Sequence, residues 1–190
     1  VFDADMASLL HNHLREQGVE LLLKADVTGF EETSDAIFTA LADGRVLESD
    51  LVMLSIGVAP ESTLAREAGL ELGLRGSIKV DATMRTSDPD IYTVGDAVEI
   101  TNVVTGSSAL IALAGPANKQ GRIAADNICG RESEFGGSQG SSVLKLFELD
   151  AASTGLTLTA ARAAGIDAEA VILSPANHAT YYPGAETMTL

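Results

Sequence analysis

The chain has few basic residues and no long apolar segment, and each shortage excludes a class of protein. Its 190 residues include 12 Lys and Arg against 27 Asp and Glu, which gives a net charge of −15. Nucleic acid is therefore not a predicted partner, because phosphates bind to basic surfaces. No run of 18 apolar residues is present, so no membrane span is predicted. The first residues also lack the basic and then apolar pattern of a secretion signal.

Side chains that bind metals or act as nucleophiles are equally scarce. Cys129 is the only cysteine, so an internal disulfide is impossible, which fits a cytoplasmic location. It falls near the end of a predicted helix, where the dipole disfavours a thiolate, and we expect it to be a core residue. His11 and His13 lie two residues apart on another predicted helix and point in different directions. No metal site is predicted from them.

What remains is a globular composition, since 46% of the residues are apolar. Helices are predicted from Asp3 or Asp5 to Gly18, from Ser62 to Ala68, from Pro116 to Cys129 and, after a cap at Thr159, from Ala160 to Ala164. Strand patterns cover residues 19–23, 26–32, 35–42, 46–48, 51–56, 78–80, 143–149 and 168–173. This order predicts an α/β fold with a small antiparallel excursion around Asp43-Gly44. The Gly/Ser-rich stretch from Glu132 to Ser142 is the predicted domain boundary.

The stretch from Thr86 to Asp96 has the most informative local pattern. Asp88-Pro89-Asp90 predicts a turn, because Pro fixes its own φ and disfavours helix in the residue before it. Ile91 to Val94 is β-branched and aromatic, which predicts a short buried strand. Gly95 and Asp96 follow at the predicted carboxyl end of this strand, where open α/β sheets bind ligands. Gly95 lets a ligand approach the backbone, and the Asp96 carboxylate can accept from a sugar or polyol hydroxyl. An ordinary strand end followed by a turn is the alternative.

The entry into the helix predicted at Pro116 is a second candidate site. Pro suits the first turn of a helix, and Ala112-Leu113-Ala114-Gly115 brings backbone N–H groups close to the helix start. Free N–H groups and the helix dipole favour an anion or a polar carbonyl of a ligand there. On these residues alone, a plain helix entry is the alternative.

Both motifs resemble those of the pyridine nucleotide-disulfide oxidoreductases. Thr86 to Asp96 is similar to the family's second flavin-binding motif, in which the final aspartate, here Asp96, bonds a ribityl hydroxyl of FAD. Leu113 to Arg122 is similar to the helix start that faces the flavin ring. The resemblance implies that Gly95, Asp96, Leu113 and Ala114 bind the cofactor. It also implies part of a flavoprotein fold with two dinucleotide-binding domains and Rossmann-like sheets, followed by the start of an α+β dimerisation domain.

The resemblance covers nearly the whole chain and implies a domain order. Residues 1–57 resemble the second half of the NAD(P)H-binding domain, residues 58–130 the second part of the FAD-binding domain, and residues 136–190 the start of the dimerisation domain of a homodimer. His178 to Ala185 resembles a motif of the coenzyme A-disulfide reductases and the related NADH-dependent persulfide or polysulfide reductases. There the first tyrosine of a pair, here Tyr181, reaches the partner subunit's active site. A tyrosine pair that fills a core and a turn is the alternative.

The activity implied by the resemblance is hydride transfer from NAD(P)H to FAD, and then reduction of a coenzyme A disulfide, persulfide or polysulfide through a cysteine. The chain has no Gly-x-Gly-x-x-Gly and no cysteine in the family's flavin-facing position. The resemblance therefore implies part of a longer enzyme, and we expect this part alone to be inactive. An NADH oxidase or peroxidase of the same family is one alternative, and a non-catalytic nucleotide-binding module is another.

Overall fold

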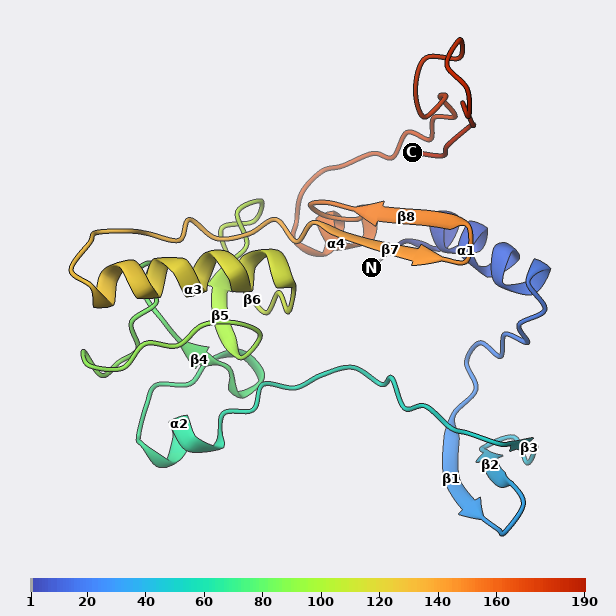
Figure 1. The fold of residues 1–190 in the computed structure, drawn as a ribbon, viewed down its shortest axis with the longest axis horizontal. Helices are drawn as coiled ribbons and strands as arrows, with labels where there is room; N and C mark the ends of the chain where they lie inside the picture. The colour runs from blue at the N-terminus through green and yellow to red at the C-terminus, as the bar shows by residue number, and fades with distance from the viewer. Residues whose placement is uncertain (1) are drawn as a thin grey trace. The chain divides into compact units, whose positions relative to one another are not determined.

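The computed structural model describes residues 2–190, which group into two units (Figure 1). One unit comprises His11–Val58, and the other comprises residues 2–10 together with residues 59–190. Both units contain helix and strand residues, and the mixed α/β class is confirmed. No helix in the described part of the chain is long and apolar enough to cross a membrane.

Helix α1 (Ala4–Glu16) has the predicted limits. The Asp3 carbonyl accepts the Ala7 N–H at 2.9 Å, which is the first hydrogen bond of the helix. Gly18 has a φ of 81°, the left-handed conformation that ends many helices and that glycine adopts without steric cost.

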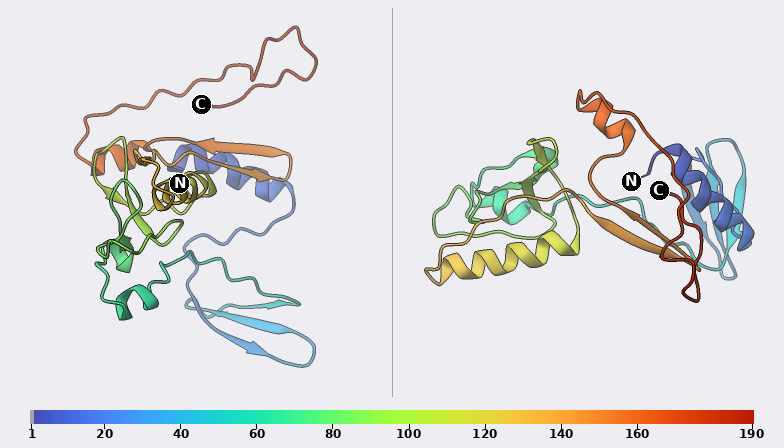
Figure 2. Two further views of the ribbon diagram at one scale, coloured as in Figure 1. Left: turned by 60° about the vertical axis from the view of Figure 1, so that its left-hand side comes forward. Right: turned by 90° about the horizontal axis from the view of Figure 1, so that it is seen from above.

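The predicted antiparallel excursion is a three-stranded sheet within His11–Val58 (Figure 2). Its strands are β1 (Val27–Glu32), β2 (Ile37–Leu41) and β3 (Val46–Ser49), and they pair in chain order. Gly44 has a φ of 89° in the turn between β2 and β3. The neighbouring Asp43 carboxylate accepts from the Arg45 guanidinium at 2.8 Å. The Asp-Gly turn and the antiparallel strands on either side of it are therefore confirmed.

The two continuous apolar runs do not form the strands predicted for them. Residues 19–23 and 51–56 form neither helix nor strand, and in the second run Met53 is 80% and Ile56 is 90% exposed. An apolar run becomes a strand only where a neighbour accepts and donates its backbone hydrogen bonds. Within residues 2–190 no segment pairs with either run.

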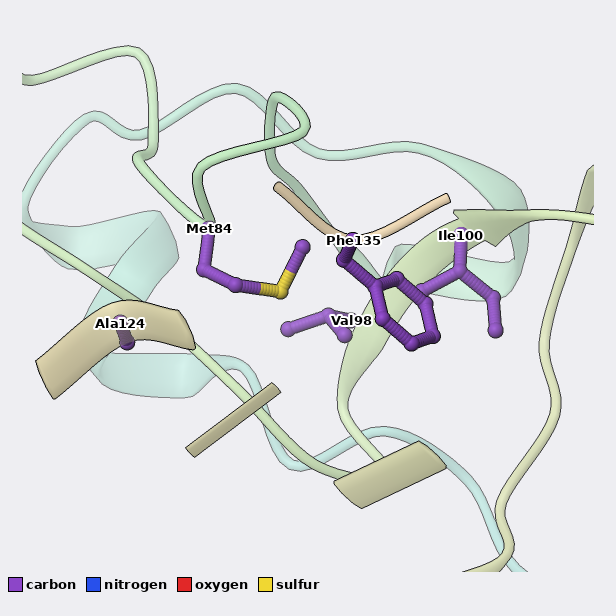
Figure 3. Packing of buried hydrophobic residues seen from close by; sticks show 5 residues of the cluster. All are labelled: Met84, Val98, Ile100, Ala124 and Phe135. Carbon is purple, nitrogen blue, oxygen red and sulfur yellow. The ribbon is translucent and has the colours of Figure 1, made fainter. Parts of the chain in front are cut away.

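The core of the second unit lies where helix α3 (Ala114–Ile128) packs on strand β5 (Val98–Thr101). Strand β4 (Ile78–Lys79) is parallel to β5, and β6 (Ser108–Ala109) pairs with it in antiparallel fashion. Helix α2 (Thr63–Glu67) and a 3₁₀ turn, η1 (Leu74–Gly76), precede them. The core side chains are Met84, Val98, Ile100, Ala124 and Phe135 (Figure 3). Cys129 follows α3 and is exposed, so the prediction that it is a core residue is wrong.

The Gly/Ser-rich stretch after α3 packs on the same core. Phe135 is 9% exposed, and its N–H donates to the Ala82 carbonyl at 2.8 Å. Ser138 continues the contact, because it donates to Thr101 at 3.0 Å and accepts from Val103 at 3.1 Å. Gly137 has a φ of 94°, and a Cβ there would overlap the Thr101 carbonyl oxygen. This stretch is therefore a packed edge of the unit, while the domain boundary itself stays a prediction.

The last 50 residues contain a hairpin, a short helix and an irregular segment. The single strand predicted over 143–149 is in fact two strands, β7 (Ser142–Leu146) and β8 (Leu149–Ser153), joined at Phe147, which has a φ of 53°. Helix α4 (Leu158–Ala163) is capped by Thr157, whose hydroxyl accepts from Ala160 at 3.2 Å, and the predicted cap at Thr159 is wrong. The strand predicted over 168–173 is absent. Instead the chain folds back, and Leu173 and Leu190 exchange two backbone hydrogen bonds (Figure 2).

The Glu99 carboxylate on β5 holds the η1 turn in place. It accepts from the Leu74 N–H at 2.6 Å, and this hydrogen bond is the main reason why the pKa of Glu99 is lowered from its ordinary value of 4.5. A Cβ at Gly73 would overlap this carboxylate, so the residue beside the turn must be glycine for the contact to form as it does.

We expect the Glu99 interaction to stabilise the fold only above acidic pH. Because its pKa is lower in the folded than in the unfolded chain, its contribution is complete above about pH 4.5 and disappears as the pH falls through the folded value. A Glu99→Gln variant should lose about 1 kcal/mol at pH 7, since solvent screens a partly exposed charge, and less at pH 3. Urea unfolding at both pH values measures this. An equal loss at both would contradict the assignment.

Candidate functional site

The predicted strand over residues 91–94 is a short antiparallel contact, not a buried strand. Thr86 N–H donates to the Ile91 carbonyl at 2.9 Å, and Thr93 N–H donates to the Met84 carbonyl at 3.1 Å. A single bridge joins Arg85 and Tyr92, and the Arg85 guanidinium also donates to the Tyr92 hydroxyl at 2.8 Å. The predicted turn at Asp88-Pro89-Asp90 lies between the two arms. The strand prediction failed because these residues pair with only one neighbour over three positions.

Gly95 and Asp96 therefore lie in a turn that leads into β5, not at the end of a preceding strand. Gly95 has a φ of 90°, and its carbonyl accepts from the Val98 N–H at 3.4 Å. Nothing lies within 4 Å of where a Cβ would stand, so glycine is required by the backbone angle and not by lack of space. Asp96 is exposed.

The Asp96 carboxylate makes no hydrogen bond or ion pair within residues 2–190. Two acidic side chains of the preceding segment differ from it in this respect. Asp88 accepts from the Asp90 N–H at 2.9 Å, and Asp81 accepts from the Thr83 N–H at 2.8 Å. An exposed carboxylate that is not used by its own turn is available to accept hydrogen bonds from a ligand.

The turn is attached to helix α3 through Gln120. This side chain is 1% exposed, and its Oε1 accepts from the Gly95 N–H at 2.7 Å. Sequence reasoning gave Gln120 no role. A signal was present, because Gln120 precedes Ala124 and Asn127 at helical spacing, so a polar residue shares the buried face of α3. Gly95 and α3 are thus brought together as one site.

The N-terminal end of α3 has free backbone donors. The helix begins at Ala114, two residues before the predicted start, and Leu113 precedes it with extended backbone angles. The N–H groups of Ala114 and Gly115 donate to nothing in the part of the chain that the structure describes, and Pro116 has no N–H to satisfy. The entry to this helix can therefore bind a carbonyl or an anionic group of a ligand.

Tyr181 lies apart from this site. It is 81% exposed on the loop between residues 177 and 186, and its ring centroid lies 4.7 Å from that of Tyr182. No hydrogen bond joins Tyr181 to the Asp96 turn or to α3 within residues 2–190. This exposure argues against the alternative in which Tyr181 fills a core.

No group of three or more His, Cys, Asp or Glu side chains in residues 2–190 could hold a metal ion. The site as the structure describes it consists of the free Asp96 carboxylate, the free N–H groups at the start of α3 and the buried Gln120 amide that accepts from Gly95. Groups of these kinds can form hydrogen bonds with hydroxyls and carbonyls of a ligand, and none of them is a nucleophile.

Residues 1–121 match the family model described as pyridine nucleotide-disulphide oxidoreductase. The chain belongs to this family. A CoA-dependent NAD(P)H sulfur oxidoreductase of Pyrococcus abyssi is 33% identical to this chain over 189 residues. The match covers the whole of this chain and 42% of the relative. The chain thus spans about two fifths of the length of the curated relatives it matches.

Two solved structures of the oxidoreductase fold are similar over nearly the whole chain. A NAD-dependent persulfide reductase from A. fulgidus has a TM-score of 0.94 and 39% identity, covering 99% of this chain and 35% of that protein. A water-forming NADH oxidase from Lactobacillus brevis has a TM-score of 0.90 and 32% identity, covering 99% of this chain and 41% of that protein. The expected family and its two-dinucleotide-binding-domain fold are therefore confirmed.

Proposed function

We propose that the complete protein is an FAD-dependent NAD(P)H oxidoreductase that reduces coenzyme A disulfide, persulfide or polysulfide. The observation that carries the proposal is the free Asp96 carboxylate on a turn attached to α3. The relative from Pyrococcus abyssi and the persulfide reductase from A. fulgidus support this substrate class.

The residues present fit FAD. Asp96 would accept a hydrogen bond from a ribityl hydroxyl, because its carboxylate is exposed and has no partner in the described residues. Leu113 ends the extended approach to α3, and the N–H groups of Ala114 and Gly115 would donate to a flavin carbonyl. Gly95 sets the direction of Asp96 through its left-handed backbone. FAD held by these residues would supply a two-electron carrier between NAD(P)H and the sulfur substrate.

The proposal extends to the domain order and the assembly. We assign residues 1–57 to the NAD(P)H-binding domain, 58–130 to the FAD-binding domain and 136–190 to the dimerisation domain of a cytoplasmic homodimer. In that dimer Tyr181 would enter the partner subunit's sulfur site, which is consistent with its exposed position on a loop. The chain would then supply Asp96 and the start of α3 to its own flavin site, and Tyr181 to the sulfur site of the other subunit.

An NADH oxidase is the second candidate, because the water-forming enzyme from Lactobacillus brevis has a TM-score of 0.90 with this chain. The two activities differ in where the electrons go. The complete protein should be assayed for NAD(P)H oxidation with coenzyme A disulfide or persulfide under argon, and with oxygen alone. Anaerobic turnover that releases thiol supports the reductase. Turnover that needs oxygen and releases no thiol supports the oxidase.

We expect Asp96→Ala to weaken FAD retention by roughly ten- to a hundred-fold, because a hydrogen bond to a charged group contributes about 1.5–3 kcal/mol. Asp96→Asn should fall between this variant and the wild type, since it keeps one acceptor oxygen without the charge. Flavin absorbance after ultrafiltration of the purified complete protein gives the measurement.

Asp90→Ala is the matched control for this prediction. Asp90 is also an exposed aspartate close to the turn, and its carboxylate makes no hydrogen bond among the described residues. The Asp90→Ala variant should therefore keep its full flavin content. If Asp96→Ala and Asp96→Asn both purify with full flavin as well, Asp96 is not a flavin ligand.

A further inference from the structure

Within the part of the chain that the structure describes, α3 has one polar side chain that is almost completely buried, and this is Gln120. A buried amide without a partner is costly, so a residue of this kind is retained where its hydrogen bond is used. Its Oε1 accepts from the N–H of Gly95, a residue 25 positions earlier in the chain, at 2.7 Å. The side chain thus connects the helix to the turn that presents Asp96.

Side-chain packing at Gly95 and Asp96 does not hold this part of the turn. Nothing lies within 4 Å of the Cβ position of Gly95, and the Asp96 side chain is exposed. Gly95 is held by its two backbone groups, since its carbonyl accepts from Val98 at 3.4 Å and its N–H donates to Gln120 at the shorter distance of 2.7 Å. Without the second bond, the left-handed glycine would be free to change its angles, and the next residue would change direction with it.

We infer that Gln120 is a positioning residue for flavin binding, which acts by holding the Gly95 N–H so that the Asp96 carboxylate keeps one direction relative to α3. This inference rests on the proposed function, because it assigns to Asp96 the ribityl hydroxyl of FAD. Gln120 itself touches no ligand in this scheme. The same bond keeps the free N–H groups at the start of α3 and the Asp96 carboxylate at a constant separation, so both can contact one rigid cofactor.

The test is a double-mutant cycle on FAD binding by the complete protein. Gln120→Met keeps the length of the side chain and removes the acceptor, so the Kd of the apoprotein for FAD should rise roughly ten-fold. In the Asp96→Ala background the same change should raise the Kd by less than about three-fold, because the carboxylate that Gln120 positions is already gone. A role in fold stability alone would multiply the Kd by the same factor in both backgrounds, and this result would overturn the inference.

Further variants complete the test. Ile128→Met places the same side chain on an exposed position of α3 and should leave the Kd unchanged. Gln120→Glu keeps an acceptor oxygen and should bind FAD within about three-fold of the wild type. Gln120→Leu, which also removes the acceptor, replaces Gln120→Met in the cycle if that variant does not fold. A ten-fold loss in Gln120→Glu with the fold intact would overturn the inference. If wild-type apoprotein binds no FAD at all, the proposed function fails instead.

Discussion

Tyr181→Phe in the complete protein is expected to lower turnover with coenzyme A disulfide or persulfide by about 10²- to 10⁴-fold, the range of a positioned general acid. The phenol O–H can donate a proton or a hydrogen bond to a departing or attacking sulfur. Phe keeps the ring and removes this donor. Because Tyr181 is 81% exposed, the change should leave the fold and the FAD content intact.

Tyr182→Phe is the control for this prediction. Tyr182 is 58% exposed, and its ring lies beside both Tyr181 and His178. Loss of the Tyr182 hydroxyl should lower turnover less than loss of the Tyr181 hydroxyl. If the two tyrosines share the role, turnover in Tyr181→Phe should fall by less than the range given above. If Tyr181→Phe reduces the disulfide and persulfide substrates at an unchanged rate, the Tyr181 hydroxyl has no role in catalysis.

Mixed dimers distinguish a tyrosine that acts in the partner subunit from one that acts in its own. A C2 interface is self-complementary, so each subunit would give its Tyr181 to the other. A subunit with Tyr181→Phe keeps its flavin, and a subunit with Asp96→Ala keeps its tyrosine. At limiting FAD, the mixture should regain activity through one complete site per mixed dimer. No recovery in dimers verified as mixed would contradict action across the interface.

Phe135→Ala is expected to destabilise the unit formed by residues 59–190 by about 3–5 kcal/mol, the usual cost of removing a buried phenylalanine. Phe135 is 9% exposed and contacts the cluster around Met84 and Val98 (Figure 3). It also attaches the stretch after α3 to the unit, because its N–H donates to Ala82. Urea unfolding followed by circular dichroism measures the loss.

Phe30→Ala serves as the comparison, because Phe30 is 48% exposed on β1 in the other unit. This substitution should lower the free energy of unfolding by clearly less than Phe135→Ala. A loss below about 1 kcal/mol in Phe135→Ala would mean that the stretch around it is a spacer and not part of the folded unit. FAD retention should also fall in Phe135→Ala, because Ala124 of α3 belongs to the same cluster as Phe135.

Local patterns were sufficient for the presence of the helices and for the antiparallel sheet, although α3 begins two residues before its predicted start and α4 is capped by Thr157 and not by Thr159. The limits of α1 follow from caps and glycines within a few residues, and the hairpin between β2 and β3 follows from Asp43-Gly44 and the alternation on either side. The motif that ends in Asp96 was also recognisable. In each case the interacting groups are neighbours in the chain, so residue order alone contains the information.

Long-range pairing could not be read in the same way. The apolar runs at 19–23 and 51–56 have strand composition but no partner within residues 2–190, and a strand exists only with a neighbour. The Gly/Ser-rich composition around Phe135 predicted a boundary, yet this ring is buried. The contact of Gln120 with Gly95 joins residues 25 positions apart. A hydrogen bond of this kind depends on where folding brings two distant backbones together, and neither residue's local context contains that information.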